Sequence, residues 1–211
     1  MTRTVHLARH GQTVWHAENR YAGVSDVPLT RQGREQAGAL ATWADAVPLA
    51  LVASSGLTRA VETAAEVAAV AGLPHVVEPD LREVDFGRAE GMTRSEMRTA
   101  FPDALDAFLA APASSPLPGG EPGAAAADRF LAAVLTVLAP VPPDEAVLVV
   151  AHTTVLRLAL CSVLGLPLDG YRRRFPALGN ATVTTLRLPE AEDLAGLRGA
   201  GALLAFNTPA G

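Results

Sequence analysis

The stretch Leu7-Ala8-Arg9-His10-Gly11-Gln12-Thr13 connects a short apolar run to a glycine-containing turn. Residues 4–8 predict a buried strand, and a helix-compatible segment follows from about residue 13. Arg9, His10 and Gly11 are therefore expected where a parallel strand gives way to a loop, and this edge is where open α/β sheets bind ligands. The glycine allows close approach of a ligand to the backbone, and the arginine places a fixed cation beside a possible nucleophile or base.

Length and composition limit the kind of protein this is. The 211 residues fit one domain, 1–211, with a full hydrophobic core, and no apolar run approaches the ~18 residues of a membrane span. A net charge of −5 argues against nonspecific nucleic-acid binding. The single cysteine, Cys161, excludes an internal disulfide, and the chain leads into its first strand without an apolar signal segment, so we expect a cytoplasmic protein. All 17 basic residues are arginines, so an arginine's position must carry more weight than its identity.

Strand and helix patterns alternate along the first half of the chain. Thr30 is a plausible N-cap for a helix that stops at Pro48, and residues 49–53 form a second apolar strand. A helix carrying apolar residues on one face then ends at Gly72, and a short strand is expected over 75–78. This alternation predicts a three-layer α/β/α sandwich with a mainly parallel central sheet.

The second half contains a looser segment followed by the strongest strand signal. Residues 93–111 predict one or two short helices, and the proline- and glycine-rich residues 112–123 predict a loop, so a lid or insertion is expected around 90–125. The later expectations are a helix over 124–139, a strand over 146–151, a buried helix over 155–164, and strands over 181–188 and 202–206.

Polar residues that could carry chemistry follow four of these elements. Arg9 and His10 end the first strand, Arg59 lies in the first turn of the helix after the second, Glu83 comes after the third, and His152 ends the Val-rich strand. Because the carboxyl ends of parallel strands lie at one edge of a sheet, these side chains are expected to converge there. Two arginines, two histidines and a carboxylate suit a phosphoryl group, which needs positive charge for its oxygens and an acid for its leaving group.

Four ordered blocks of sequence resemble the histidine phosphatase superfamily, in its phosphoglycerate-mutase-like branch. The first is Arg9-His10-Gly11-Gln12-Thr13 with Trp15, Arg20, Gly23, Pro28-Leu29-Thr30 and Gly33. The second runs from Ser54 to Ala64, and the third is Leu81-Arg82-Glu83 with Phe86-Gly87 and Glu90-Gly91. The fourth is Ala151-His152 with Val155-Leu156-Arg157. The blocks extend over most of the chain.

The resemblance implies a phosphatase that acts on a small phosphate monoester through a phosphohistidine. His10 would be the nucleophile; Arg9, Arg59 and His152 would bind the phosphoryl oxygens, and Glu83 would protonate the leaving group. It further suggests substrate contacts at seven residues: Gly11, Gln12, Thr13, His16, Arg20, Gly23 and Thr153. The alternatives are that Gln12, Thr13 and Arg20 only shape the loop and that His16 packs beside Trp15. No cofactor or metal is implied, and we find no metal-ligand spacing in the sequence.

Three departures from the family pattern leave the substrate open. His16 replaces a usual asparagine, Thr153 and Thr154 follow His152 where glycines are common, and Pro122 replaces a common serine. None of these changes removes a member of the catalytic set.

Other interpretations remain at this point. A phosphoglycerate mutase would use the same site, and a non-catalytic phospholigand-binding module would share the fold, whereas a Rossmann-like nucleotide binder is disfavoured because no glycine-rich phosphate loop is present. Asp85 or Glu90 could be the acid instead of Glu83. We expect structural roles for His6 and His75 and a solvated cluster at 172–174, with a substrate-rim role as the alternative. An exposed apolar edge at 202–206 would favour a homodimer.

Overall fold

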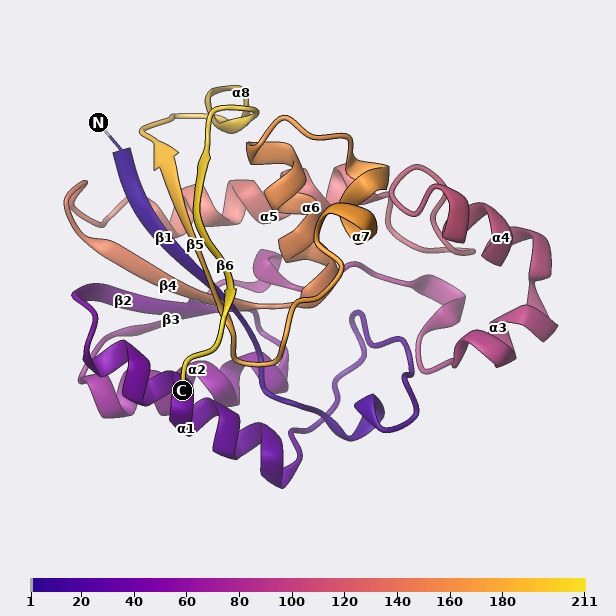
Figure 1. Ribbon diagram of the computed structural model, residues 1–211, viewed down its shortest axis with the longest axis horizontal. Coiled ribbons are helices and arrows are strands. Elements are labelled where there is room, and N and C mark those ends of the chain that lie inside the picture. Colours follow the sequence, from indigo (N-terminus) through magenta and orange to yellow (C-terminus); the bar gives the residue numbers. More distant parts are fainter. Residues whose placement is uncertain (1) are drawn as a thin grey trace.

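The computed structural model describes residues 2–211, and within this range six strands form one mixed sheet (Figure 1). The strand order is β3-β2-β4-β1-β5-β6; β2 is parallel to β3 and β4, β4 is parallel to β1, and β5 and β6 each run antiparallel to the preceding strand in this order. The strands are β1 (Thr2–Arg9), β2 (Leu49–Ser54), β3 (His75–Val77), β4 (Ala146–Ala151), β5 (Val183–Pro189) and β6 (Ala202–Thr208). The expected mainly parallel α/β sheet is confirmed.

Helices cover the sheet on both sides, and two short helices extend beside it (Figure 1). Helices α1 and α2 lie together on one side, α5 and α6 lie on the other, and α3 and α4 project from the sheet's edge. The helices are α1 (Arg31–Asp45), α2 (Thr58–Ala71), α3 (Arg94–Ala100), α4 (Pro102–Ala110), α5 (Gly123–Leu138), α6 (Thr153–Val163), α7 (Tyr171–Arg174) and α8 (Leu194–Leu197).

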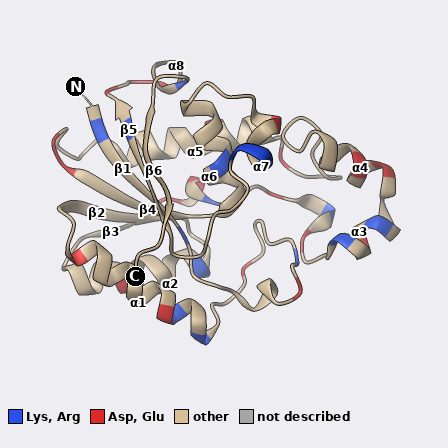
Figure 2. Ribbon diagram, viewed as in Figure 1, with Lys and Arg blue, Asp and Glu red and all other residues tan. Residues whose placement is uncertain are grey.

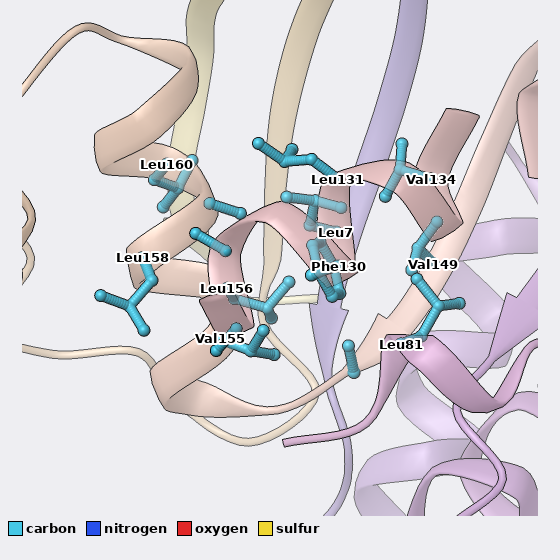
Figure 3. Close-up of a cluster of buried hydrophobic side chains, with 14 of the residues drawn as sticks. Leu7, Leu81, Phe130, Leu131, Val134, Val149, Val155, Leu156, Leu158 and Leu160 are labelled. Atoms are coloured by element: carbon cyan, nitrogen blue, oxygen red, sulfur yellow. The ribbon is translucent and has the colours of Figure 1, made fainter. Parts of the chain in front are cut away.

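Alternating side chains of the central strands supply two separate cores. Leu7 and Val149 face α5 and α6 in the larger core, part of which is drawn in Figure 3. Ala8 and Val150 face the alanine-rich surfaces of α1 and α2. Every residue of β4 is buried, as its continuous apolar sequence predicts for a strand covered on both faces. The carboxyl ends of β1, β2 and β4 are thus held rigidly side by side.

Local signals in the sequence mark several boundaries correctly. The Thr30 hydroxyl accepts a hydrogen bond from the Gly33 N–H and caps α1, while Gly72 ends α2 with a left-handed φ of 65°. The expected segment after Thr13 is, in contrast, only a single 3₁₀ turn, Val14–His16, followed by an irregular loop. Across residues 2–211, no helix is long and apolar enough to cross a membrane.

Candidate active site

Three neighbouring strands bring the predicted catalytic residues to one edge. β1 and β2 flank β4, and the backbone N–H of His10 continues the β1–β4 ladder by donating to the Ala151 carbonyl at 3.0 Å. The imidazole rings of His10 and His152 therefore lie near each other, with centroids 5.1 Å apart. Residues separated by more than 140 positions in sequence meet because their strands are adjacent.

The ring of His10 is oriented and kept neutral by its surroundings. Its Nδ1 lies 2.7 Å from the Gly11 carbonyl oxygen, which can only accept, so Nδ1 carries the proton and Nε2 keeps its lone pair. Burial, followed by the positive charges of Arg59 and Arg9, holds the pKa of His10 well below its usual value. A neutral imidazole with a free Nε2 has the form that a nucleophile requires.

His152 is the N-cap residue of α6 and is buried beside His10. Its Nε2 lies 2.7 Å from the hydroxyl of Ser55, which directly follows β2. Its Nδ1 is buried and has no hydrogen-bond partner among the described residues. Burial is the main reason that the pKa of His152 lies well below its usual value, with smaller contributions from Arg59 and His10.

Arg9 and Arg59 supply fixed positive charge next to the two imidazoles. Arg9 Nη1 donates to the Leu178 carbonyl at 2.8 Å, Nη2 contacts His16 Nε2, and burial lowers the pKa of Arg9 to about 10. Arg59 is completely buried, and its terminal nitrogens donate to the carbonyls of Ser25 at 2.8 Å and Gly23 at 2.7 Å. Backbone carbonyls of the loop 23–25 thus hold the guanidinium of Arg59 in the first turn of α2.

Buried polar atoms without a partner are confined to this set of residues. Within residues 2–211, the buried side-chain nitrogens or oxygens that lack a hydrogen bond are Nε of Arg9, Nε of Arg59 and Nδ1 of His152. Leaving such groups unpaired is costly, so natural proteins rarely do so outside functional sites. Two guanidinium N–H donors and an imidazole nitrogen are the groups that would bind an oxyanion.

Glu83 reaches the same region from the loop after β3. Its side chain is 2% exposed, and its oxygens accept backbone hydrogen bonds from Val84 at 2.9 Å and from Thr154 and Val155 at 2.8 Å each. The last two N–H groups belong to the first turn of α6, so the carboxylate also caps this helix.

The two alternative acids are engaged elsewhere. Asp85 accepts from the Gly87 N–H at 2.7 Å, whereas Glu90 binds backbone N–H groups of the loop 23–25 and of Phe86. Neither carboxylate lines the cavity, whereas Glu83 does. The geometry favours Glu83 over both.

A cavity of about 710 Å³ opens above His10 and receives only part of the predicted substrate-binding set. Its wall includes Thr13, His16, Arg20 and Thr153. The other three predicted contacts have structural roles. Gly11 packs so closely on Gly33 that a Cβ would lie 2.2 Å from its carbonyl oxygen, Gln12 bonds to Thr30, and the Gly23 carbonyl holds Arg59.

His16, which replaces a usual asparagine, is tied to Arg9. Its Nε2 faces Arg9 Nη2, and its Nδ1 lies 2.8 Å from the Thr13 hydroxyl. Burial and then the charge of Arg9 lower the pKa of His16 to about 4. A neutral His16 orients the guanidinium without cancelling its charge.

Several residues of the site were not predicted. Ser55 holds His152, and the Asn180 amide donates to the His10 carbonyl at 2.9 Å. Arg157, to which the sequence assigned no role, and Arg172, for which a substrate-rim role was the alternative interpretation, also line the cavity. Ser55 lies within the second sequence block, so its position after β2 was a usable signal; Asn180 lies in a loop with no such signal.

Comparisons with known proteins agree with this geometry. The model of the histidine phosphatase superfamily (branch 1) matches residues 5–194. A probable phosphoglycerate mutase GpmB of Escherichia fergusonii is 30% identical over 191 residues, covering 90% of this chain and 87% of the relative. The chain therefore belongs to the histidine phosphatase superfamily, branch 1, and is an enzyme of this phosphatase class.

Solved structures of the same architecture include named phosphatases. A mycobacterial glucosyl-3-phosphoglycerate phosphatase superposes with a TM-score of 0.87 at 29% identity, with 99% of this chain and 100% of that chain covered. A putative alpha-ribazole-5'-P phosphatase of Escherichia coli gives 0.82 at 25% identity, with 98% and 97% covered. The similarity thus extends across the whole fold. The phosphatases that share this fold are named for different substrates.

Proposed function

We propose that the protein hydrolyses small phosphate monoesters through a phosphohistidine on His10 Nε2. The observation that carries this proposal is the neutral His10 ring, fixed by Gly11 and facing His152 at 5.1 Å among buried arginines. His10 Nε2 attacks phosphorus as the bond to the ester oxygen breaks, and the bonding electron pair leaves with that oxygen. The arrangement requires no proton removal from the nucleophile.

The unpartnered nitrogens bind the phosphoryl oxygens in this scheme. Arg9 Nε, Arg59 Nε and His152 Nδ1 give the oxyanion the contacts that they lack in the protein alone. Their positions are fixed by neighbouring carbonyls and by Ser55, so little reorganisation accompanies the reaction. The arginines supply the positive charge that a divalent cation gives in other phosphoryl-transfer enzymes.

Glu83 acts as the acid and then as the base. Its Oε2 accepts a single backbone hydrogen bond, so one lone-pair direction remains for a proton shared with the substrate. The carboxyl group gives this proton to the departing alcohol oxygen. It then takes a proton from the water whose oxygen attacks phosphorus and displaces His10.

Hydrolysis is favoured over isomerisation because the cavity is not enclosed by the segment predicted to cover it. None of residues 112–123 lines the cavity, and this segment is instead packed against Asp85 and Asp169 through backbone hydrogen bonds. Within the predicted lid, 90–125, we assign the covering role to α3, because its Arg94 lines the cavity. A mutase must retain the phosphorylated intermediate for return to its substrate, whereas a phosphatase must admit water.

The second candidate function is a phosphoglycerate mutase, because relatives carry that name. Incubation with 3-phosphoglycerate, with and without catalytic 2,3-bisphosphoglycerate, separates the two by measuring free phosphate and 2-phosphoglycerate. We expect phosphate release without accumulation of the isomer. Isomer formation without phosphate release would assign the mutase activity instead.

The cellular compartment and the oligomeric state of the enzyme are also proposed here from the chain's own residues. The buried thiol of Cys161, with its pKa raised by burial, is consistent with a structural cysteine in a reducing cytoplasm. β6 is an edge strand with Leu204 47% exposed, so pairing of this edge with a second copy would give a homodimer. Sedimentation of the purified protein tests the dimer.

A further inference from the structure

The cavity extends well beyond the phosphoryl-binding residues. Its volume of about 710 Å³ lies in the range of pockets that hold an entire small metabolite. One wall is formed by Arg157 of α6 together with Tyr171 and Arg172 of α7. Figure 2 shows α7 as a block of basic residues beside α6. The leaving group of the substrate would therefore contact a strongly basic wall.

The charges on this wall are not balanced by carboxylates. Several arginines elsewhere in residues 2–211 form ion pairs, such as Arg31 with Glu35 and Arg98 with Asp106. Arg20 also lines the cavity, but its charge is paired with Glu18 and Glu96. Arg94 at the outer rim has no ion pair within the described residues either, but its side chain is exposed to solvent.

Arg157 and Arg172 differ from the ion-paired arginines because they have no carboxylate within 4.0 Å in the described chain, and they differ from Arg94 because they are half-buried. Burial is the main cause that lowers the pKa of Arg157, and the opposing effects of Tyr171 and Glu83 offset it only in part. The acidic residues of the cavity do not supply the missing partner, because Glu18 pairs with Arg20 and Glu83 is held by three N–H groups.

Both guanidinium groups are fixed in place by contacts that leave part of their terminal N–H donors free. Arg157 Nε donates to the Thr153 carbonyl at 2.9 Å and Nη1 to the Phe175 carbonyl at 3.3 Å, which leaves the Nη2 donors, and the guanidinium carbon lies 4.9 Å from the centre of the Tyr171 ring. Arg172 Nε donates to the Tyr171 hydroxyl at 3.1 Å, and its guanidinium lies 4.5 Å from the centre of the Phe108 ring. Stacking occupies the faces of a guanidinium and leaves its in-plane N–H groups for an oxyanion.

We propose that Arg157 and Arg172 form a second oxyanion subsite, which selects phosphate monoesters bearing another anionic group, either a carboxylate or a second phosphate. This inference rests on the proposed function, because the subsite binds the part of the substrate that leaves with the ester oxygen. The wall would hold the second anion while His10 attacks the first phosphoryl group. A neutral leaving group would leave both arginines unpaired.

Matched substrates test the proposal directly. 3-Phosphoglycerate and glycerol 3-phosphate differ by a carboxylate in place of a hydroxymethyl group, and fructose 1,6-bisphosphate and fructose 6-phosphate differ by a second phosphate. Hydrogen bonds to charged groups predict that wild-type kcat/KM favours the anionic member of at least one pair by about 10- to 100-fold. The favoured pair identifies the carboxylate or the phosphate as the second anion.

Arg172→Gln and Arg157→Gln should each reduce this preference at least fivefold, because one of two charged contacts is lost. The matched control is Arg173→Gln, which removes an exposed arginine from the same short helix and should leave the preference unchanged. Circular dichroism melting identifies any variant that fails to fold, and the two positions provide independent tests.

The outcomes separate this inference from the proposed function. Wild-type enzyme that hydrolyses p-nitrophenyl phosphate but shows equal kcat/KM within both pairs would overturn the subsite and leave the phosphatase intact. Absence of hydrolysis of every substrate would overturn the phosphatase. In that case calorimetric affinities of 3-phosphoglycerate and glycerol 3-phosphate decide the subsite: tighter binding of the former that is lost in Arg172→Gln supports it, and equal binding refutes it.

Discussion

Replacing Glu83 by glutamine separates its two roles, because the carboxylate caps α6 and, in the proposed mechanism, protonates the leaving group. The amide keeps the size of the side chain but substitutes an NH₂ donor for one oxygen. One of the three backbone N–H groups that now donate to the carboxylate, those of Val84, Thr154 and Val155, would then face a donor. The variant should therefore lose stability and catalysis by independent amounts.

The magnitudes follow from the contacts. Losing one hydrogen bond to a charged acceptor costs about 1.5–3 kcal/mol, and a chain of this length changes its Tm by roughly 2–4 °C per kcal/mol, so the melting temperature should fall by about 3–12 °C. Loss of general acid catalysis should reduce kcat by about 10²- to 10⁴-fold for an alkyl phosphate. The loss should be far smaller for p-nitrophenyl phosphate, whose leaving group departs without a proton.

The assay compares kcat for the two esters in wild type, Glu83→Gln and the control Glu90→Gln. Glu90 also holds backbone N–H groups but does not line the cavity, so its variant should lose stability without a dependence on the leaving group. Equal loss of both activities in Glu83→Gln, parallel to that in Glu90→Gln, would refute the reasoning and reduce Glu83 to a structural cap.

Three further predictions concern the imidazoles and the charge of the site. Ser55→Ala removes the partner of His152 Nε2 and should lower kcat about tenfold through misorientation of the ring; unchanged kcat in a folded variant would show that Ser55 does not position His152. The pKa values of His10, His152 and His16 lie below 6.5 in the folded protein, so the unfolded chain binds more protons than the folded chain below that pH. The Tm should therefore fall as the pH decreases from 6.5 to about 5. A constant Tm over this range would contradict the neutral imidazoles. Chelators should leave the rate unchanged, and inhibition that added metal reverses would show that the arginines do not supply the required charge.

The elements that form the site were predictable where local signals and burial agree. β4 has a continuous apolar sequence because both of its faces are covered, and Gly72 ends α2 because a left-handed residue is needed there. Parallel strands bring their carboxyl ends together, so the approach of His10 to His152 followed from topology alone.

The wall of the cavity formed by α7 was not predictable in detail, because it depends on loops and short helices without periodic patterns. The sequence favoured a solvated cluster at 172–174, and this is wrong for Arg172, which stacks on Phe108 and lines the cavity, while Arg173 and Arg174 are exposed. The contact of Arg172 with Phe108 joins α7 to α4, and no pattern in the sequence specifies this contact. The cap that Glu83 provides to α6 likewise required the loop path after β3.

Chemical trapping of the phosphorylated protein tests the central proposal most directly. Rapid quenching in alkali during turnover of a ³²P-labelled monoester, followed by alkaline digestion and chromatography against standards of the two phosphohistidine isomers, detects label on a histidine and distinguishes Nε2 from Nδ1. We predict a burst of acid-labile, base-stable label at Nε2 of His10 that is absent in His10→Ala. Phosphate release by wild type without any bound label, or equal label in His10→Ala, would contradict the phosphohistidine mechanism.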